Sequence, residues 1–186
     1  MRAIAIVGSA SLCATLAIAS SARAERGIDG TINPGLTASA SLHDRGVAPG
    51  LEISGVRWLP SDNGWLSIGP IVQATLPARN DTGTARYRRL MLGGEIAWTA
   101  IGIELGYAYQ SASDEASPTH AVHLAPFLSL GVLSIAAPIN LPFAHSGSLD
   151  GHPIDFGVLV AVKLPLLIEK DGRVRGFWAF FEYIGG

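Results

Sequence analysis

The sequence predicts an all-β fold, an antiparallel up-and-down β-barrel, and three observations lead to that prediction. Within "IGIELGYAYQ", Ile101–Gln110, every second residue is large and apolar, which is the period of a strand with one apolar face. Similar alternating segments of about ten residues recur along the chain. The polar connections between them alternate between long and short, as in barrels built from consecutive hairpins.

Nine candidate strands follow from the alternation. They are, in order, residues 35–42, 51–58, 65–76, 89–98, 101–110, 120–130, 131–139, 154–164 and 173–184. The segment 131–139 shows no clear period, and residues 27–32 could add a further strand. Because bacterial single-chain barrels usually have an even number of strands, we expect eight strands, with ten as the alternative.

The connections predict which strand ends lie together. Long polar connections are "HDRGVAP", "PARNDTGTAR", "SASDEASPT" and "LPFAHSGSLDGHP". Short ones are "PSDNG", the bends near residues 99–100 and 130–131, and "EKDGR", where Asp-Asn-Gly and Asp-Gly are hairpin turn sequences. We therefore expect long loops at one end of the barrel and short turns at the other.

The N-terminal segment predicts export. Residues 1–24 combine an early Arg2 with an apolar stretch and end in Ala22-Arg23-Ala24, the layout of a cleaved signal peptide. This divides the chain into a signal peptide, residues 1–24, and a barrel domain, residues 25–186. Cys13 is the only cysteine, so the mature chain is expected to have no disulfide and no thiolate metal site.

The composition bears on the surroundings of the barrel. Charged residues make up 15% of the chain and the formal net charge is −2, so no basic surface for nucleic acid is expected. Soluble domains carry about 25% charged residues. The shortfall indicates that much of the surface does not face water, and it favours a transmembrane β-barrel whose aliphatic face contacts lipid.

The opposite face of the same strands is expected to fill a narrow lumen. It is mostly small or polar, and its charges have both signs and can pair. The predicted luminal charges are Glu52, Arg89, Glu95, Glu104, Asp155, Lys163 and Glu182. Aromatic residues near strand ends would form interfacial girdles on the lipid-facing side: Trp58, Trp98, Tyr107, Tyr109 and Tyr183.

With these features the mature chain resembles the small bacterial outer-membrane β-barrel superfamily. The terminal segment "GFWAFFEYIGG" looks like the C-terminal assembly signal of that superfamily, with alternating Phe177, Phe181 and Tyr183. The resemblance implies an outer-membrane location, contact with membrane lipid and lipopolysaccharide, and assembly by the barrel-assembly machinery. Arg79, Arg86 and Arg88 cluster around a long connection and are expected to contact lipopolysaccharide phosphates.

The resemblance and the composition lead us to expect a non-enzymatic barrel that presents loops or supports the envelope, without cofactor or metal. A second hypothesis is a lipid- or acyl-modifying enzyme that uses a hydrolytic set from one loop, His145, Ser146, Asp150 and His152. The same histidines and aspartate could also hold a metal. The sequence is also compatible with a small pore, with a soluble periplasmic lipid-binding barrel and, because residues 124–139 form a long apolar run, with a helical membrane protein. Sequence leaves the oligomeric state open.

Overall fold

A computed structural model describes residues 28–42, 47–61, 64–76 and 88–179. Consecutive strands pair antiparallel from β1 through β6. The strands are β1 Ile28–Ser41, β2 Val47–Ser61, β3 Gly64–Thr75, β4 Arg89–Trp98, β5 Ile101–Gln110, β6 Thr119–Ser129, β7 Leu133–Ala136, β8 Ile139–His145, β9 Asp155–Lys163, β10 Leu166–Glu169 and β11 Val174–Arg175.

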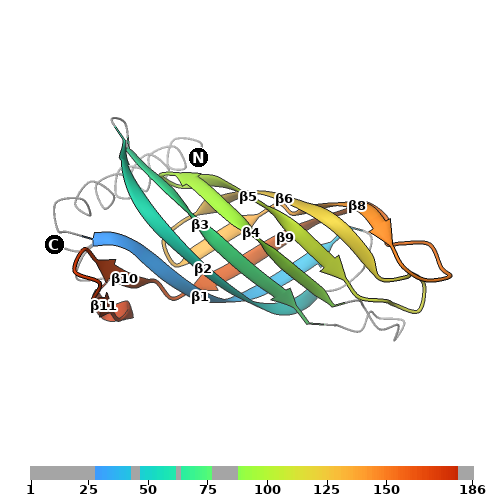
Figure 1. Cartoon of the computed structure of the whole chain (residues 1–186). Coiled ribbons are helices and arrows are strands. Elements are labelled where there is room, and N and C mark those ends of the chain that lie inside the picture. The colour runs from blue at the N-terminus through green and yellow to red at the C-terminus, as the bar shows by residue number, and fades with distance from the viewer. Residues whose placement is uncertain (1–27, 43–46, 62–63, 77–87, 180–186) are drawn as a thin grey trace, which may run out of the picture.

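The sheet closes on itself as an eight-stranded antiparallel barrel (Figure 1). The seventh barrel strand consists of β7 and β8, which both pair with β6 and β9. The eighth consists of β9 and β10, which both pair with β1. Pro138 and Pro165 stand at the two interruptions, where a residue without an N–H cannot extend the ladder. The structure thus confirms the prediction of eight strands.

Several of the predicted strand boundaries were wrong. The first strand begins at Ile28, so the segment around residues 28–32 extends β1 and adds no further strand. The weakly patterned segment after Gly131 does contribute a barrel strand, β7, and the predicted long connection that follows is strand as far as His145. Residues 124–139 are therefore β-structure, and no helix among the described residues is long and apolar enough to cross a membrane.

Residues 173–179, the described part of the C-terminal segment, do not form a ninth barrel strand. Among its described residues only Val174–Arg175 is extended, as a short partner of β10, and residues 177–179 form a helical turn. Gly172 at φ 83° reverses the chain directly after β10, because glycine adopts this left-handed conformation without steric penalty. The predicted assembly signal is therefore not a strand over residues 177–179, and its remainder, including Phe181 and Tyr183, lies outside the described residues.

Long connections lie at one end of the barrel and tight turns at the other. The β5–β6 and β8–β9 loops lie at the long-loop end, whereas the β4–β5 and β6–β7 turns and the β10–β11 hairpin lie at the opposite, short-turn end (Figure 1). The two-residue turn Thr99-Ala100 places Thr99 at φ 58°. The arrangement agrees with the alternation of connection lengths in the sequence.

Side chains alternate between the lumen and the outside as expected for a barrel. Along β4, buried residues at every second position, such as Met91 and Ala97, alternate with exposed ones such as Leu92. Trp58 is an exception to our prediction. Trp58 lies six positions from Glu52 on β2, so both side chains face the same side of the sheet, the lumen. It also packs against a buried cluster, so it does not belong to an outer aromatic girdle.

Candidate functional site

The middle of the lumen contains an ion-pair cluster centred on Lys163. The Lys163 Nζ lies 2.5 Å from Glu52 Oε1 and 3.8 Å from Glu95 Oε2. All three residues are buried, with exposed fractions of 7% or less. These side chains come from β9, β2 and β4 and meet across the lumen, because the barrel is narrow enough for opposite walls to make contact.

Gln73 extends this cluster to a fourth charge. Its Nε2 donates to Glu52 Oε2 at 3.1 Å and to Glu104 Oε2 at 2.9 Å. Both amide hydrogens are thus used to hold two carboxylates that would otherwise repel each other. A buried carboxylate is tolerated only when such donors replace water, so the Gln73 amide helps to stabilise Glu52 and Glu104 in the lumen.

His123 and Asn140 continue the chain of contacts toward β9. The Nδ2 of Asn140 donates to Asp155 Oδ2 at 3.5 Å, so its Oδ1 is left to accept from His123 Nδ1, 2.9 Å away. The other ring nitrogen of His123 faces Glu104 Oε2 at 3.4 Å.

The resulting luminal network joins the walls of the barrel through side chains. It runs from Glu95 through Lys163, Glu52, Gln73, Glu104, His123 and Asn140 to Asp155, whose Oδ1 accepts from the Ser41 hydroxyl. Five of the predicted luminal charges belong to it. The polar residues that connect these charges were not predicted, although His123, Gln73 and Asn140 also occupy lumen-facing positions of their strands.

Arg89 differs from the prediction. It is buried in the lumen, at 6% exposure, but its hydrogen bond is to a neutral group: Nη2 donates to Thr75 Oγ1 at 3.3 Å. Its Nε has no hydrogen-bond partner among the residues that the structure describes. Arg89 lies at the long-loop end of β4, away from Glu95 on the same strand, and this explains why it does not join the network.

An apolar layer crosses the lumen on the short-turn side of the network. Phe127 is the large residue of a buried cluster that otherwise contains Ala97, Ala125, Ala136, Leu159 and Ala161. Its ring occupies the space where a side chain at Gly102 would lie, since a Cβ there would overlap Phe127 Cζ. Lys163 Nζ lies 6.0 Å from the ring centroid, so the ring adjoins the ion-pair cluster.

A second apolar cluster lies beyond this layer, at the short-turn end. Ile28 and Leu167 are buried there, and Trp58, Val132 and Ala179 pack against them. The β10–β11 hairpin and the helical turn after it contribute to this cluster, which gives the C-terminal segment a packing role. The lumen therefore has two successive apolar layers below a polar middle.

The β8–β9 loop is hydrogen-bonded to the β5–β6 loop at the long-loop end of the barrel. Ser117 in the facing loop donates through Oγ to Leu149 O at 2.7 Å, and its N–H donates to Asp150 O at 2.8 Å. His152 N donates to Thr119 Oγ1 at 2.8 Å, and its ring Nε2 lies 2.9 Å from Ser111 O. The loop is thus fixed to the β5–β6 loop, and His152 is buried where the two loops meet.

The candidate hydrolytic residues are placed in different environments. His152 is buried at the mouth of the lumen, with its ring beside a backbone carbonyl, whereas His145, Ser146 and Asp150 are exposed. No group of three or more His, Cys, Asp or Glu that could hold a metal occurs among the described residues. The arrangement gives no support to a nucleophile–base pair in this loop.

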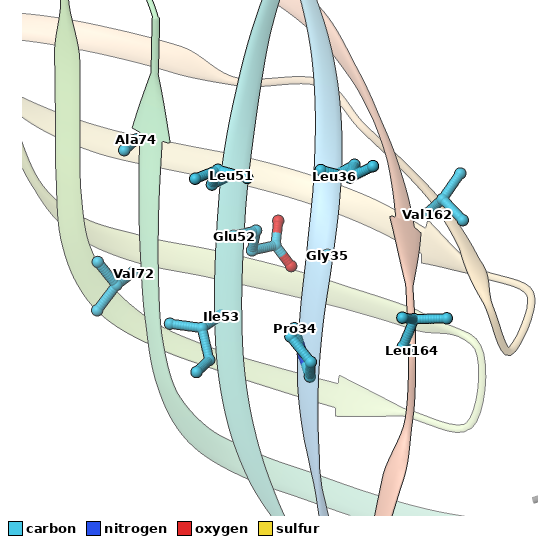
Figure 2. A pocket seen from close by; sticks show the side chains of 10 residues that line it. All are labelled: Pro34, Gly35, Leu36, Leu51, Glu52, Ile53, Val72, Ala74, Val162 and Leu164. Atoms are coloured by element: carbon cyan, nitrogen blue, oxygen red, sulfur yellow. The ribbon is translucent and has the colours of Figure 1, made fainter. Parts of the chain in front are cut away.

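The outer wall of the barrel is aliphatic. Large apolar side chains exposed at 40% or more occur on every barrel strand, among them Leu36, Ile53, Leu92, Leu105 and Val162. Figure 2 shows several of them around a groove of about 540 Å³ on β1, β2, β3 and the adjoining end of β9. Gly35 and Pro34 line the groove between larger neighbours.

An aromatic group lies on the outer wall near the long-loop end. His120 Nδ1 is 2.5 Å from the Tyr107 hydroxyl, and its ring lies 5.6 to 6.4 Å from the rings of Tyr107, Tyr109 and Phe143. His123, three residues along β6, points into the lumen instead, as the strand period predicted. Arg88 is exposed at the same end, whereas Arg79, Arg86 and Glu182 lie outside the described residues.

Comparisons with protein-family models, with curated proteins and with solved structures found no match.

Proposed function

We propose that this protein is an integral outer-membrane β-barrel with a non-enzymatic role, in which a filled barrel anchors the long loops in the cell envelope. One observation carries the proposal: the polarity of the barrel is inverted, with exposed aliphatic residues outside and buried charges inside. In water the outer wall would favour association of several chains, whereas in a bilayer it is matched to the hydrocarbon.

The interior favours this role over the competing functions. A soluble lipid-binding barrel needs an apolar cavity, but the middle of this lumen holds the Lys163 network. A pore needs a continuous polar path, whereas the Phe127 layer interrupts it. A hydrolytic enzyme needs its nucleophile and base held in contact, whereas Ser146 and His145 are exposed in the loop and His152 is buried with its ring beside Ser111 O.

A charge placed on the outer wall tests whether that wall faces a bilayer. Leu105, 57% exposed in the middle of β5, is replaced by arginine. If Leu105 faces the centre of a bilayer, the substitution should lower the free energy of unfolding by about 2–4 kcal/mol. On a surface facing water the free energy of unfolding should change by no more than about 0.5 kcal/mol. The measurement is urea unfolding of the chain without residues 1–24 in lipid vesicles.

Ala112→Arg, at an exposed position of the β5–β6 loop, is the matched control and should leave stability unchanged. Cell fractionation of the full-length chain provides a second readout. We expect the protein in the outer membrane, with a gel mobility that changes on boiling. Release with the periplasm, together with an unaltered stability of the Leu105→Arg barrel, would disprove the proposal.

We further propose that Arg88, with Arg86 in the preceding segment, contacts lipopolysaccharide phosphates. Arg88 is exposed at the long-loop end of the outer wall, on the same side of the sheet as Leu90 and Tyr109. Replacing both arginines with alanine should lower the amount of lipopolysaccharide that co-purifies with the barrel, because guanidinium groups bind phosphate by paired hydrogen bonds. Unchanged co-purification would argue against this contact, and Arg175→Ala at the other end serves as the control.

A further inference from the structure

The long-loop end of the lumen contains a row of polar side chains that the network does not use. Thr75, Arg89, Gln110 and Thr119 are directly opposite one another on β3, β4, β5 and β6. Arg89 is 6% exposed, and Gln110 and Thr119 are completely buried. Because these four side chains face the lumen and are paired in register, a guanidinium, an amide and two hydroxyls lie together on one wall.

Several polar atoms in this row lack partners. Neither Nε2 nor Oε1 of Gln110 has a hydrogen-bond partner among the described residues, and the same is true of Arg89 Nε. Buried polar groups in proteins are nearly always paired, and a buried guanidinium without a counter-ion is costly. The unused donors and the positive charge face the same part of the lumen, so they indicate a ligand there.

The row is separated from the carboxylates of the network. The next inward-facing residues on β4, β5 and β6 are Met91, Ala108 and Ala121, all with 0% exposure. Thr119 Oγ1 also accepts from the His152 N–H, so the β8–β9 loop is bonded to the row at its β6 end. The positive charge of Arg89 thus lies between an apolar layer and a loop, where its field is weakly screened.

We propose that Arg89 and Gln110 bind a small protonated oxyanion of the hydrogen phosphate type inside the lumen. Its charged oxygens accept from the Arg89 guanidinium and from Gln110 Nε2. Its hydroxyl donates to Gln110 Oε1, an acceptor without a partner among the described residues. A simple halide satisfies the donors but not this acceptor, so phosphate should bind more tightly than chloride.

Thermal unfolding of the barrel domain, residues 25–186, in zwitterionic detergent tests the site, with inorganic phosphate as the probe and chloride at equal ionic strength as comparison. At a phosphate concentration of about 100 times the Kd, the folding equilibrium constant should rise about 100-fold. Arg89→Met should weaken phosphate binding at least about tenfold, because it removes hydrogen bonds to a charged group. Arg175→Met, which changes an exposed arginine at the other end of the barrel, should bind phosphate as the unaltered chain does.

Gln110→Leu provides a second variant if Arg89→Met does not fold, since it removes only uncharged atoms. Broadening of the phosphorus NMR signal by the unaltered barrel reports binding independently of stability. The proposal is overturned if phosphate has no effect beyond that of chloride, or if Arg89→Met and Gln110→Leu retain the effect. Stabilisation by micelles containing phosphatidic acid, without an effect of free phosphate, would assign the phosphoryl group to a lipid and overturn the free-anion site.

Discussion

Replacing Lys163 with methionine should lower the free energy of unfolding by about 3–5 kcal/mol, one of the two largest losses that we expect from a single substitution. Lys163 is the cation of the ion-pair cluster and lies 2.5 Å from Glu52 and 3.8 Å from Glu95. Without it, two buried carboxylates lose their counter-charge in a lumen from which water is largely excluded. Urea unfolding in lipid vesicles, extrapolated to zero denaturant, measures the loss.

The loss of the charge can be separated from the removal of a long side chain. Lys163→Met combined with Glu52→Gln should recover part of the stability, because the second change removes one of the uncompensated charges. Arg175→Met is the control for a partly exposed pair, since Arg175 lies 2.7 Å from Glu169 at the short-turn end, and should cost at most about 1 kcal/mol. A loss below about 1 kcal/mol for Lys163→Met would contradict the importance of the cluster.

Phe127→Ala should destabilise the barrel by a similar amount, about 3–5 kcal/mol. The ring fills the apolar layer between Gly102 and the four alanines of its cluster, and none of these small residues can extend into the space that it would leave. The substitution therefore removes apolar burial and leaves a cavity. The midpoint of unfolding in vesicles measures the effect.

Leu128→Ala is the matched control for Phe127→Ala, because Leu128 is adjacent in the sequence but faces outward, with 40% of its surface exposed. If the outer wall faces lipid, as we propose, lipid can fill the space, so this change should cost only about 1 kcal/mol. Equal losses for the two variants would show that the Phe127 layer does not pack as described.

The period of the strands explains why much of the fold could be predicted. Alternation identified the inward parity of Glu52, Glu95, Glu104, Asp155 and Lys163, since adjacent residues on a strand must face opposite sides. It could not determine which charges meet, because contacts across the lumen depend on the stagger of the strands around the barrel. Arg89 has the correct parity but lies at a different level of the lumen, and no pattern along a single strand encodes that difference.

The total of eight strands was predicted correctly, but the choice of segments that form them was partly wrong, for a different physical reason. Closure depends on pairing between the first and last strands of the barrel, which are far apart in the sequence. The segment at residues 173–179 alternates like a strand, yet the edge that it would need is already occupied by β10 pairing with β1. Conversely, β7 has a poor pattern but is paired on both sides, with β6 and with β9. Neighbouring strands decide such cases more than local sequence does.

The pairing of β1 with β9 also limits how the chain can fold. Gly35 is opposite Lys163, so the seam forms only after nearly all of the intervening chain has been synthesised. Contacts of such long sequence separation slow folding, because the entropy of closing a large loop is lost before the contact stabilises anything. The ion pair between Lys163 and Glu52 spans this seam. This ion pair can therefore form only late in folding, and fragments that end before β9 should be unable to complete the barrel.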